Sequence, residues 1–213
     1  MLKFFYHPIS VNARRVWVAL LEKQIPFEPV LVDLNNEQFS DEFSAINPLQ
    51  RVPAIDDDGL RVIESLAILD YLEARYPQPA LMPTMPEAIA TVRMVESVTV
   101  GDLQLATFPL TRPVVGLKVE AQKLEAAQQR VAKILSFFEQ LLGNGTYFCG
   151  DKFTRADIVA GTLVPSLPLV DYPQLAAWAQ RLSDRESWQQ TATQPEDIEA
   201  ALPMIRSILE RRS

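Results

Sequence analysis

The chain has 213 residues, 48% of them hydrophobic, and carries 27 acidic against 20 basic side chains, for a formal net charge of −7. A chain of this length buries roughly 70% of the surface that it exposes when unfolded, which is enough for one large core or two smaller ones. The negative net charge argues against a nucleic-acid partner, which favours clustered Lys and Arg. The single His7 and the single Cys149 argue against a disulfide framework, a metal site and a histidine-based catalytic triad.

No window of the sequence approaches 18 consecutive apolar residues, so we expect no membrane-spanning helix and no membrane partner. The first ten residues lack the long apolar run and the small-residue cleavage site of a secretory leader. These two features together predict a soluble protein of the reducing cytoplasm.

The first 77 residues alternate short β-like runs with helical patterns, as expected for an α/β domain. Strands are predicted at residues 3–6, 29–32, 52–55 and 60–63, the last two forming a hairpin around the turn 56–59. Helices are predicted at 11–23, 37–46 and 65–75. The predicted order is therefore β-α-β-α-β-β-α.

Residues 78–86 are rich in proline and show no periodicity, which predicts a linker between a domain at 1–77 and a second domain at 87–213. The second domain contains no convincing strand pattern. Helices are predicted at 87–107, 118–142 and 173–182, with a last helix from about residue 203. Thr154 and Asp157 have the spacing of a capping box that opens one more helix. The second domain is thus expected to be all-helical.

The segment from Tyr6 to Ser10 leads from a predicted strand into a predicted helix. Both residues carry a hydroxyl near the unpaired backbone N–H groups of the helix start, which is a favourable place for an anion. A hydroxyl there would donate a hydrogen bond to a thiolate and lower its pKa. Alternatively, Ser10 caps the helix and Tyr6 packs beneath it, and on this segment alone capping is the favoured interpretation.

Two further segments place polar groups at the ends of predicted strands. Pro53 opens a strand, which predicts either a plain trans proline or a cis Val52–Pro53 bond that leaves the Val52 N–H and C=O free for an extended peptide. Ser65 follows a strand at a helix start, where its hydroxyl and backbone N–H suit a carboxylate, and Glu64 suits an ammonium group. Ser65 acting only as a helix cap is the alternative.

In their order and spacing, these marks resemble those of the cytosolic glutathione transferases along the whole chain. The marks are Ser10 before the first helix, Asn47-Pro48 with Val52-Pro53, Glu64-Ser65-x-Ala67-Ile68, and Gly150-Asp151 with Thr154-x-Ala156-Asp157. The resemblance implies an N-terminal thioredoxin-like domain that binds glutathione and an all-helical domain that shapes a pocket for a hydrophobic electrophile. It also implies a homodimer and no cofactor beyond glutathione as co-substrate.

The same resemblance implies roles for individual residues. Val52 would pair with the cysteinyl backbone of glutathione, Glu64 and Ser65 would bind the γ-glutamyl end, and Gln38 with Arg51 would bind the glycine carboxylate. Ser10 is favoured as the thiol-activating residue, as in the serine-type theta and phi branches. Tyr6 is the first alternative, and a backbone amide or an arginine is a further one. The Ser-Ser-Cys mark of the zeta isomerases is absent.

The implied activity is conjugation of glutathione to small hydrophobic electrophiles, as in detoxification. A non-catalytic regulatory or interaction protein is the alternative from another class, and a glutathione-dependent peroxidase or isomerase is the alternative on the same scaffold. Phe108, Leu110 and Val114 are expected in a Pro/Gly-interrupted stretch after the first C-terminal helix, where they line the electrophile pocket or belong to the core.

Overall fold

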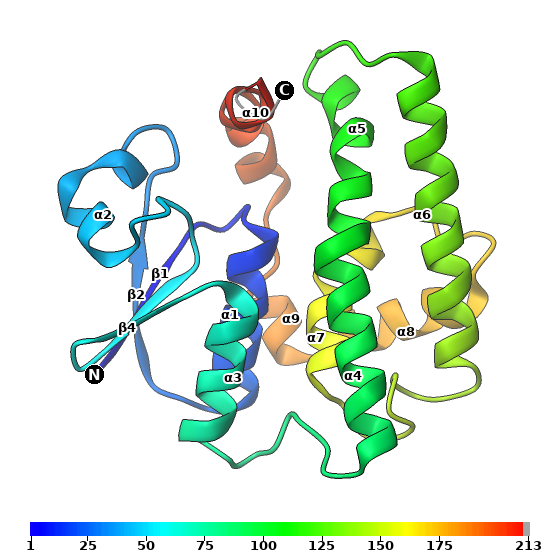
Figure 1. The fold of residues 1–213 in the computed structure, drawn as a ribbon, viewed down its shortest axis with the longest axis horizontal. Coiled ribbons are helices and arrows are strands. Elements are labelled where there is room, and N and C mark those ends of the chain that lie inside the picture. Colours follow the sequence, from blue (N-terminus) through cyan, green and yellow to red (C-terminus); the bar gives the residue numbers. More distant parts are fainter. Residues whose placement is uncertain (211–213) are drawn as a thin grey trace.

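A computed structural model describes residues 1–210 and shows a sheet-containing N-terminal part followed by helices (Figure 1). The N-terminal elements follow the predicted order: β1 (Leu2–Tyr6), α1 (Val11–Glu22), β2 (Phe27–Leu31), a 3-10 turn η1 (Glu37–Phe39), α2 (Asp41–Ile46), β3 (Ala54–Asp57), β4 (Leu60–Ile63) and α3 (Ser65–Arg75). The predicted helix at 37–46 is divided at Ser40, whose side chain caps α2. The thioredoxin-like class predicted from the sequence is confirmed.

The four strands form one mixed sheet in the order β2-β1-β3-β4. The edge strand β2 runs parallel to β1, whereas β3 runs antiparallel to both β1 and β4. The register aligns Tyr6 with Leu31, Phe5 with Ala54, and Ala54 with Ile63. The ends of β1, β2 and β4 and the start of β3 therefore meet at one edge of the sheet.

The N-terminal core lies between this sheet and the helices α1 and α3, which pack side by side (Figure 1). The inward face of α1 is apolar and contributes Val16 and Leu20, which are fully buried. They join Phe4 of β1, Ile55 of β3 and Ile68 of α3 in one hydrophobic cluster. Because α1 also contacts α7 and α9, its other side meets the helical part of the molecule.

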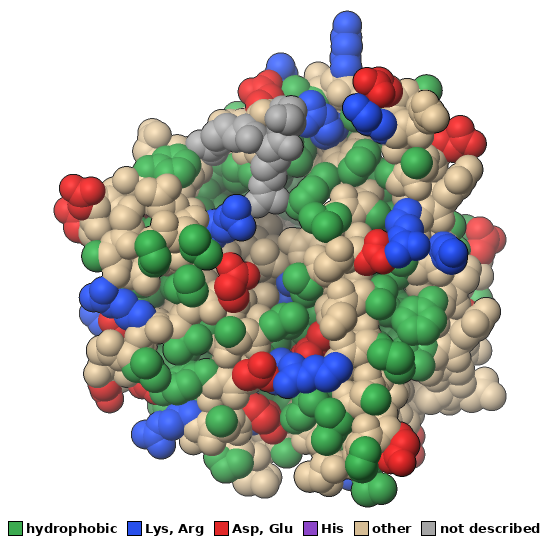
Figure 2. All heavy atoms as spheres, viewed as in Figure 1, with side chains coloured by type: hydrophobic (Ala, Val, Ile, Leu, Met, Phe, Trp, Pro, Cys, Tyr) green, Lys and Arg blue, Asp and Glu red, His purple; other side chains and the backbone are tan. Residues whose placement is uncertain are grey.

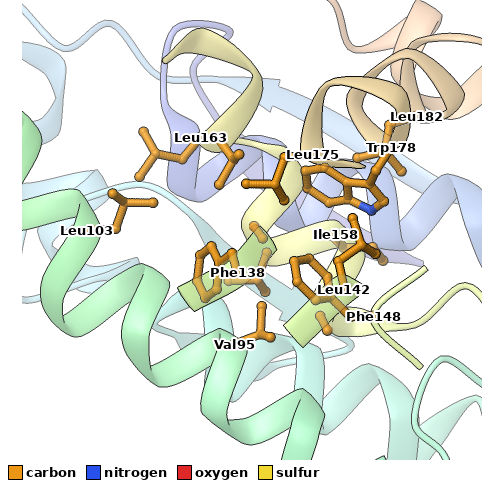
Figure 3. Packing of buried hydrophobic residues seen from close by; sticks show 14 of the residues in the cluster. Val95, Leu103, Phe138, Leu142, Phe148, Ile158, Leu163, Leu175, Trp178 and Leu182 are labelled. Carbon is orange, nitrogen blue, oxygen red and sulfur yellow. The ribbon is translucent and has the colours of Figure 1, made fainter. Parts of the chain in front are cut away.

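The rest of the described chain is helical and contains no extended strand beyond β4. Its elements are α4 (Pro86–Val98), a π-helical turn η2 (Thr99–Leu103), α5 (Gln104–Val114), α6 (Ala121–Leu142), α7 (Arg155–Gly161), a 3-10 turn η3 (Val164–Ser166), α8 (Pro173–Ser183), α9 (Glu186–Gln190) and α10 (Pro195–Glu210). Figure 3 shows their shared core, in which Phe138 and Trp178 are fully buried. The predicted all-helical class of this part is confirmed.

Two helix boundaries differ from the prediction. The helical run that begins with α4 continues beyond residue 107 and includes Pro109 and Pro113 of α5. Each proline removes one backbone donor, and the packing of α5 against α6 compensates for that loss. The last helix begins at Pro195 rather than near residue 203, and Pro203 lies inside it. A proline in the sequence therefore does not mark a helix boundary when tertiary packing supports the helix on both sides of it.

The capping box at the start of α7 also connects distant segments. The Asp157 carboxylate accepts hydrogen bonds from the backbone N–H groups of Thr154 (2.9 Å) and Phe148 (3.1 Å) and from the indole N–H of Trp178 (3.0 Å). Asp157 is fully buried, and this burial raises the pKa of its carboxyl group although the hydrogen bonds oppose the shift. One carboxylate thus joins the turn before α7 to α8.

The surface is consistent with the acidic composition. On the face drawn in Figure 2, Lys and Arg side chains are interspersed with Asp and Glu rather than gathered into one large patch. Within residues 1–210, no helix combines the length and apolarity needed to cross a bilayer.

Candidate functional site

The residues singled out from the sequence come from segments that leave or enter the same edge of the sheet. Ser10 follows β1, Val52 precedes β3, and Glu64 with Ser65 follows β4. Gln38 lies in the segment that follows β2, which runs parallel to β1. The strand register therefore brings together residues that are up to 55 positions apart in the sequence.

Ser10 is the N-cap of α1, and its Oγ accepts a hydrogen bond from the Ala13 N–H at 3.2 Å. A serine hydroxyl that accepts one bond still has a proton to donate. No described residue receives that proton, so it is available to a ligand atom at the start of the helix. The capping and thiol-activating interpretations of Ser10 are therefore compatible with each other.

Tyr6 is arranged differently. Its ring stacks on Phe4 with the ring centroids 5.2 Å apart and lies edge-on to Trp17 of α1 at 4.8 Å. The ring therefore belongs to the packing between β1 and α1. This placement supports the alternative in which Tyr6 packs beneath the helix, and it favours Ser10 as the donor to a ligand.

The loop before β3 presents an unpaired stretch of backbone. The Val52–Pro53 bond is cis, Val52 is 7% exposed, and its N–H and C=O form no backbone hydrogen bond with residues 1–210. The buried side chain of Asn47 holds the loop, since its amide donates to the Arg51 carbonyl and its oxygen accepts from the Leu49 N–H at 2.9 Å. This role of Asn47 was not predicted, although the Asn47-Pro48 pair in the sequence was a signal for it.

Glu64 and Ser65 lie at the junction of β4 and α3. Glu64 has φ = +68°, a left-handed conformation that costs a non-glycine residue about 1 kcal/mol or more and that is enriched at functional sites. Ser65 is only 7% exposed and is the first residue of α3, where backbone N–H groups lack partners within the helix. The junction thus combines a carboxylate, a hydroxyl and free N–H groups.

Gln38 and Arg51 differ in their surroundings. Gln38 is buried, donates from Nε2 to the Leu34 carbonyl at 2.7 Å, and has an Oε1 without a partner in the described chain. Arg51 is exposed, and its guanidinium makes no hydrogen bond or ion pair with residues 1–210. Arg51 therefore suits an anionic group, whereas Gln38 offers a buried acceptor.

A cavity of about 260 Å³ adjoins this edge. It is bounded by the β1–α1 loop, by the segment after β2 and by one side of α10, through His7, Pro8, Ile9, Leu31, Asn35, Asp197, Ala200, Ala201 and Met204. Figure 1 shows α10 standing between α2 and α5. A hydrogen bond from Thr193 to the Pro8 carbonyl at 3.2 Å ties the start of α10 to the loop.

The residues of α10 that line the cavity were not among the predicted site residues, because the last helix was predicted to begin only at about residue 203. Phe108, Leu110 and Val114 were predicted either to line the electrophile pocket or to belong to the core. All three lie within α5: Leu110 packs against the helical core, and Val114 is 71% exposed. Leu110 thus fits the core alternative.

His7 lines the same cavity. Its Nδ1 accepts a hydrogen bond from the Ile9 N–H at 3.4 Å. Burial lowers the pKa of His7, with Asp33 and Asp197 opposing the shift, so its neutral form is favoured at neutral pH. Because Nδ1 is an acceptor in that form, the ring proton is on Nε2.

Comparisons with known proteins agree with this geometry. Residues 4–80 match the glutathione S-transferase N-terminal domain, and residues 102–186 match the corresponding C-terminal domain. A mouse (Mus musculus) maleylacetoacetate isomerase is 34% identical over 159 residues, covering 72% of this chain and 70% of that protein. A glutathione S-transferase of Arabidopsis thaliana is 30% identical over 203 residues, covering 87% and 96%.

Among solved structures, a glutathione transferase homologue from Sulfitobacter with bound glutathione superimposes with a TM-score of 0.75 at 27% identity, covering 89% of this chain and 96% of that one. The chain therefore belongs to the glutathione transferase family. The resemblance noted in the sequence is confirmed.

Proposed function

We propose that the protein is a glutathione transferase that holds glutathione at the sheet edge as a thiolate and conjugates it to small hydrophobic electrophiles. The observation that carries this proposal is the Ser10 hydroxyl, which caps α1 and still has a proton to donate at the helix start. The membership of the chain in a glutathione-dependent family supplies the thiol ligand for that proton.

The chemistry requires a lowered thiol pKa. A cysteine thiol titrates near pH 8.5, and lowering its pKa by about two units requires about 2.7 kcal/mol of preferential binding of the thiolate. A hydrogen bond from Ser10 and the positive end of α1 act in that direction. The thiolate sulfur then attacks an electrophilic carbon held close to it, a C–S bond forms, and the leaving group departs with its electron pair.

The other site residues would orient glutathione. In this proposal the free Val52 backbone pairs with the cysteinyl unit, Ser65 binds the γ-glutamyl carboxylate and Glu64 its ammonium group. Arg51 takes the glycine carboxylate beside Gln38. The cavity between the β1–α1 loop and α10 would accept the electrophile, and its mostly apolar wall suits a small hydrophobic one.

The proposal also covers the co-substrate, the oligomeric state and the cellular location of the enzyme. Glutathione would be its only co-substrate, with no further cofactor, and it would act as a cytoplasmic homodimer, as the family resemblance implies. Exposed apolar side chains on and beside α4, such as Met85 and Met94, mark a surface that a second copy would cover.

A glutathione-dependent isomerase is the second candidate, because the mouse relative is named maleylacetoacetate isomerase. An isomerase returns its glutathione, whereas a conjugating transferase consumes it. The absence of the Ser-Ser-Cys mark around Ser10 favours conjugation as the first candidate.

The test is turnover with glutathione and 1-chloro-2,4-dinitrobenzene in Ser10→Ala and Tyr6→Phe, with glutathione consumption measured directly. Ser10→Ala is expected to lower turnover tenfold or more, about 1.4 kcal/mol in barrier, while glutathione binding stays nearly intact. Tyr6→Phe is expected to change turnover by less than about twofold, which is about 0.4 kcal/mol.

Ser40→Ala is the matched control, because Ser40 caps α2 as Ser10 caps α1, accepting from the Phe43 N–H at 3.1 Å. Both serine variants lose about 1 kcal/mol of cap stability, but only Ser10→Ala is expected to lose turnover. Full turnover in Ser10→Ala with a tenfold loss in Tyr6→Phe would transfer the role to Tyr6.

A further inference from the structure

Arg15 carries a charge that no carboxylate of residues 1–210 neutralises by contact. Its side chain is fully buried, and within the described chain its guanidinium donates only to neutral oxygens. These acceptors are Asn12 Oδ1 at 2.6 Å, Gln104 Oε1 at 3.0 Å and Thr162 Oγ1 at 3.2 Å. The three acceptors come from α1, from α5 and from the end of α7, so the side chain is held on every side.

The charged groups near Arg15 do not neutralise its positive charge. Glu96 of α4 attracts it from a distance, but the Glu96 carboxylate is bound to Arg155 and to Arg93, each at 2.9 Å. Arg14, its neighbour on α1, donates to the neutral oxygens of Thr191 and Trp188. Burial lowers the pKa of Arg15 to about 10, so the side chain remains protonated at neutral pH.

The charge lies close to the start of α1. Ser10 and Arg15 are five residues apart, which corresponds to a rise of about 7.5 Å along the helix axis. The contact with Asn12, three residues earlier, shows that the side chain turns back toward the N-terminus of the helix. Burying a cation without a contacting carboxylate is costly, so such a cation close to a ligand site is a candidate for a role at that site.

We infer that Arg15 is a positioning residue of the thiol site, whose buried positive charge helps to hold the sulfur of glutathione at Ser10 as a thiolate. This inference rests on the proposed function. Arg15 need not touch the sulfur, because charges in a water-excluded region interact over several ångströms with little screening.

The test neutralises Arg15 without removing it. Gln104→Glu has nearly the same shape, keeps the contact with Arg15 and adds the missing negative charge. The pKa of the thiol of bound glutathione, followed by thiolate absorbance, is expected to rise by about one unit, or tenfold in the thiolate-to-thiol ratio at a given pH. Gln104→Leu is the control: it removes the hydrogen bond from Arg15 without adding a negative charge, and is expected to shift the thiol pKa by less than about 0.3 unit.

Arg15→Met removes the charge outright and is expected to give the same rise as Gln104→Glu; should it not fold, Gln104→Glu decides alone. An unchanged thiol pKa in Gln104→Glu with glutathione still bound would overturn the inference, as would equal shifts in Gln104→Glu and Gln104→Leu. If the unsubstituted protein itself binds glutathione with a thiol pKa near 8.5, the proposed function fails first. A lowered pKa in that protein that Gln104→Glu leaves unchanged contradicts the role of Arg15 alone.

Discussion

Two buried arginines cross the boundary between the sheet-containing part and the helical part, and they differ in their partners. Arg155 of α7 binds the carboxylates of Asp70 on α3 and Glu96 on α4. Arg15 of α1 binds an asparagine, a glutamine and a threonine. Their exposures are 1% and 0%, so burial alone does not separate them.

Because their partners differ, the two arginines have different roles. The carboxylates around Arg155 cancel its charge, which leaves a structural contact that fastens α7 to α3 and α4. The amide and hydroxyl oxygens around Arg15 satisfy its N–H groups but leave its charge, which acts at the start of α1. The partners of these two arginines, rather than their burial, therefore distinguish them.

The largest effect is expected from Arg155→Met. It leaves Glu96 buried without its main partner, and breaking a buried ion pair in this way costs about 3–5 kcal/mol of unfolding free energy. Urea denaturation measures the loss.

Arg93→Met is the control for that experiment. Arg93 binds the same two acids as Arg155, but its side chain is 45% exposed, so its removal should cost less than about 1 kcal/mol. Equal losses in the two variants would contradict the distinction between buried and exposed pairing.

The next effect concerns Asp157, the acidic counterpart of Arg15, since it too is buried among neutral partners. Asp157→Asn replaces an acceptor oxygen with an amide that faces N–H donors, and is expected to cost about 2–3 kcal/mol of unfolding free energy. Denaturation at pH 7 measures it. A loss below about 0.5 kcal/mol would show that the carboxylate does not hold the turn before α7.

The smallest effect is the acid sensitivity of the Arg155 cluster. Burial raises the pKa of Asp70, but hydrogen bonds from Arg155 and Arg93 outweigh it, and the net pKa lies below the ordinary value. A lowered carboxyl pKa gives stability that is full above the unfolded-state pKa of about 3.9 and is lost as the pH falls through the folded-state value.

Asp70→Asn should therefore flatten the fall of unfolding free energy between pH 5 and pH 3. Its effect at pH 7 should be below about 1 kcal/mol, because Asp70 is half exposed. If the unfolding free energy of Asp70→Asn falls as steeply with decreasing pH as that of the unsubstituted protein, Asp70 does not contribute to the acid sensitivity.

Sequence patterns were sufficient for the local features of this molecule. The strand and helix order, the capping box and the serine before α1 depend on short-range preferences, which are visible in consecutive residues. The alignment of Ser10, Val52 and Glu64 at one edge followed from the family resemblance and is explained by the strand register.

Other features depend on partners that are distant in the sequence. Nothing near Arg15 and Arg155 in the sequence shows that one meets Gln104 and the other Glu96. The early start of α10, and with it one wall of the cavity, was missed because Pro203 suggested a helix boundary. Such features come from tertiary packing, which overrides local propensity.

The most direct test of this account is the pKa of glutathione's thiol when it is bound to the unsubstituted protein. Ultraviolet thiolate absorbance of the saturated complex is followed from pH 5 to pH 9. The hydroxyl of Ser10, the start of α1 and the charge of Arg15 together predict a midpoint near pH 6.5, about two units below that of a free cysteine thiol. A midpoint near 8.5 with glutathione bound would contradict the activation of the thiol at this site.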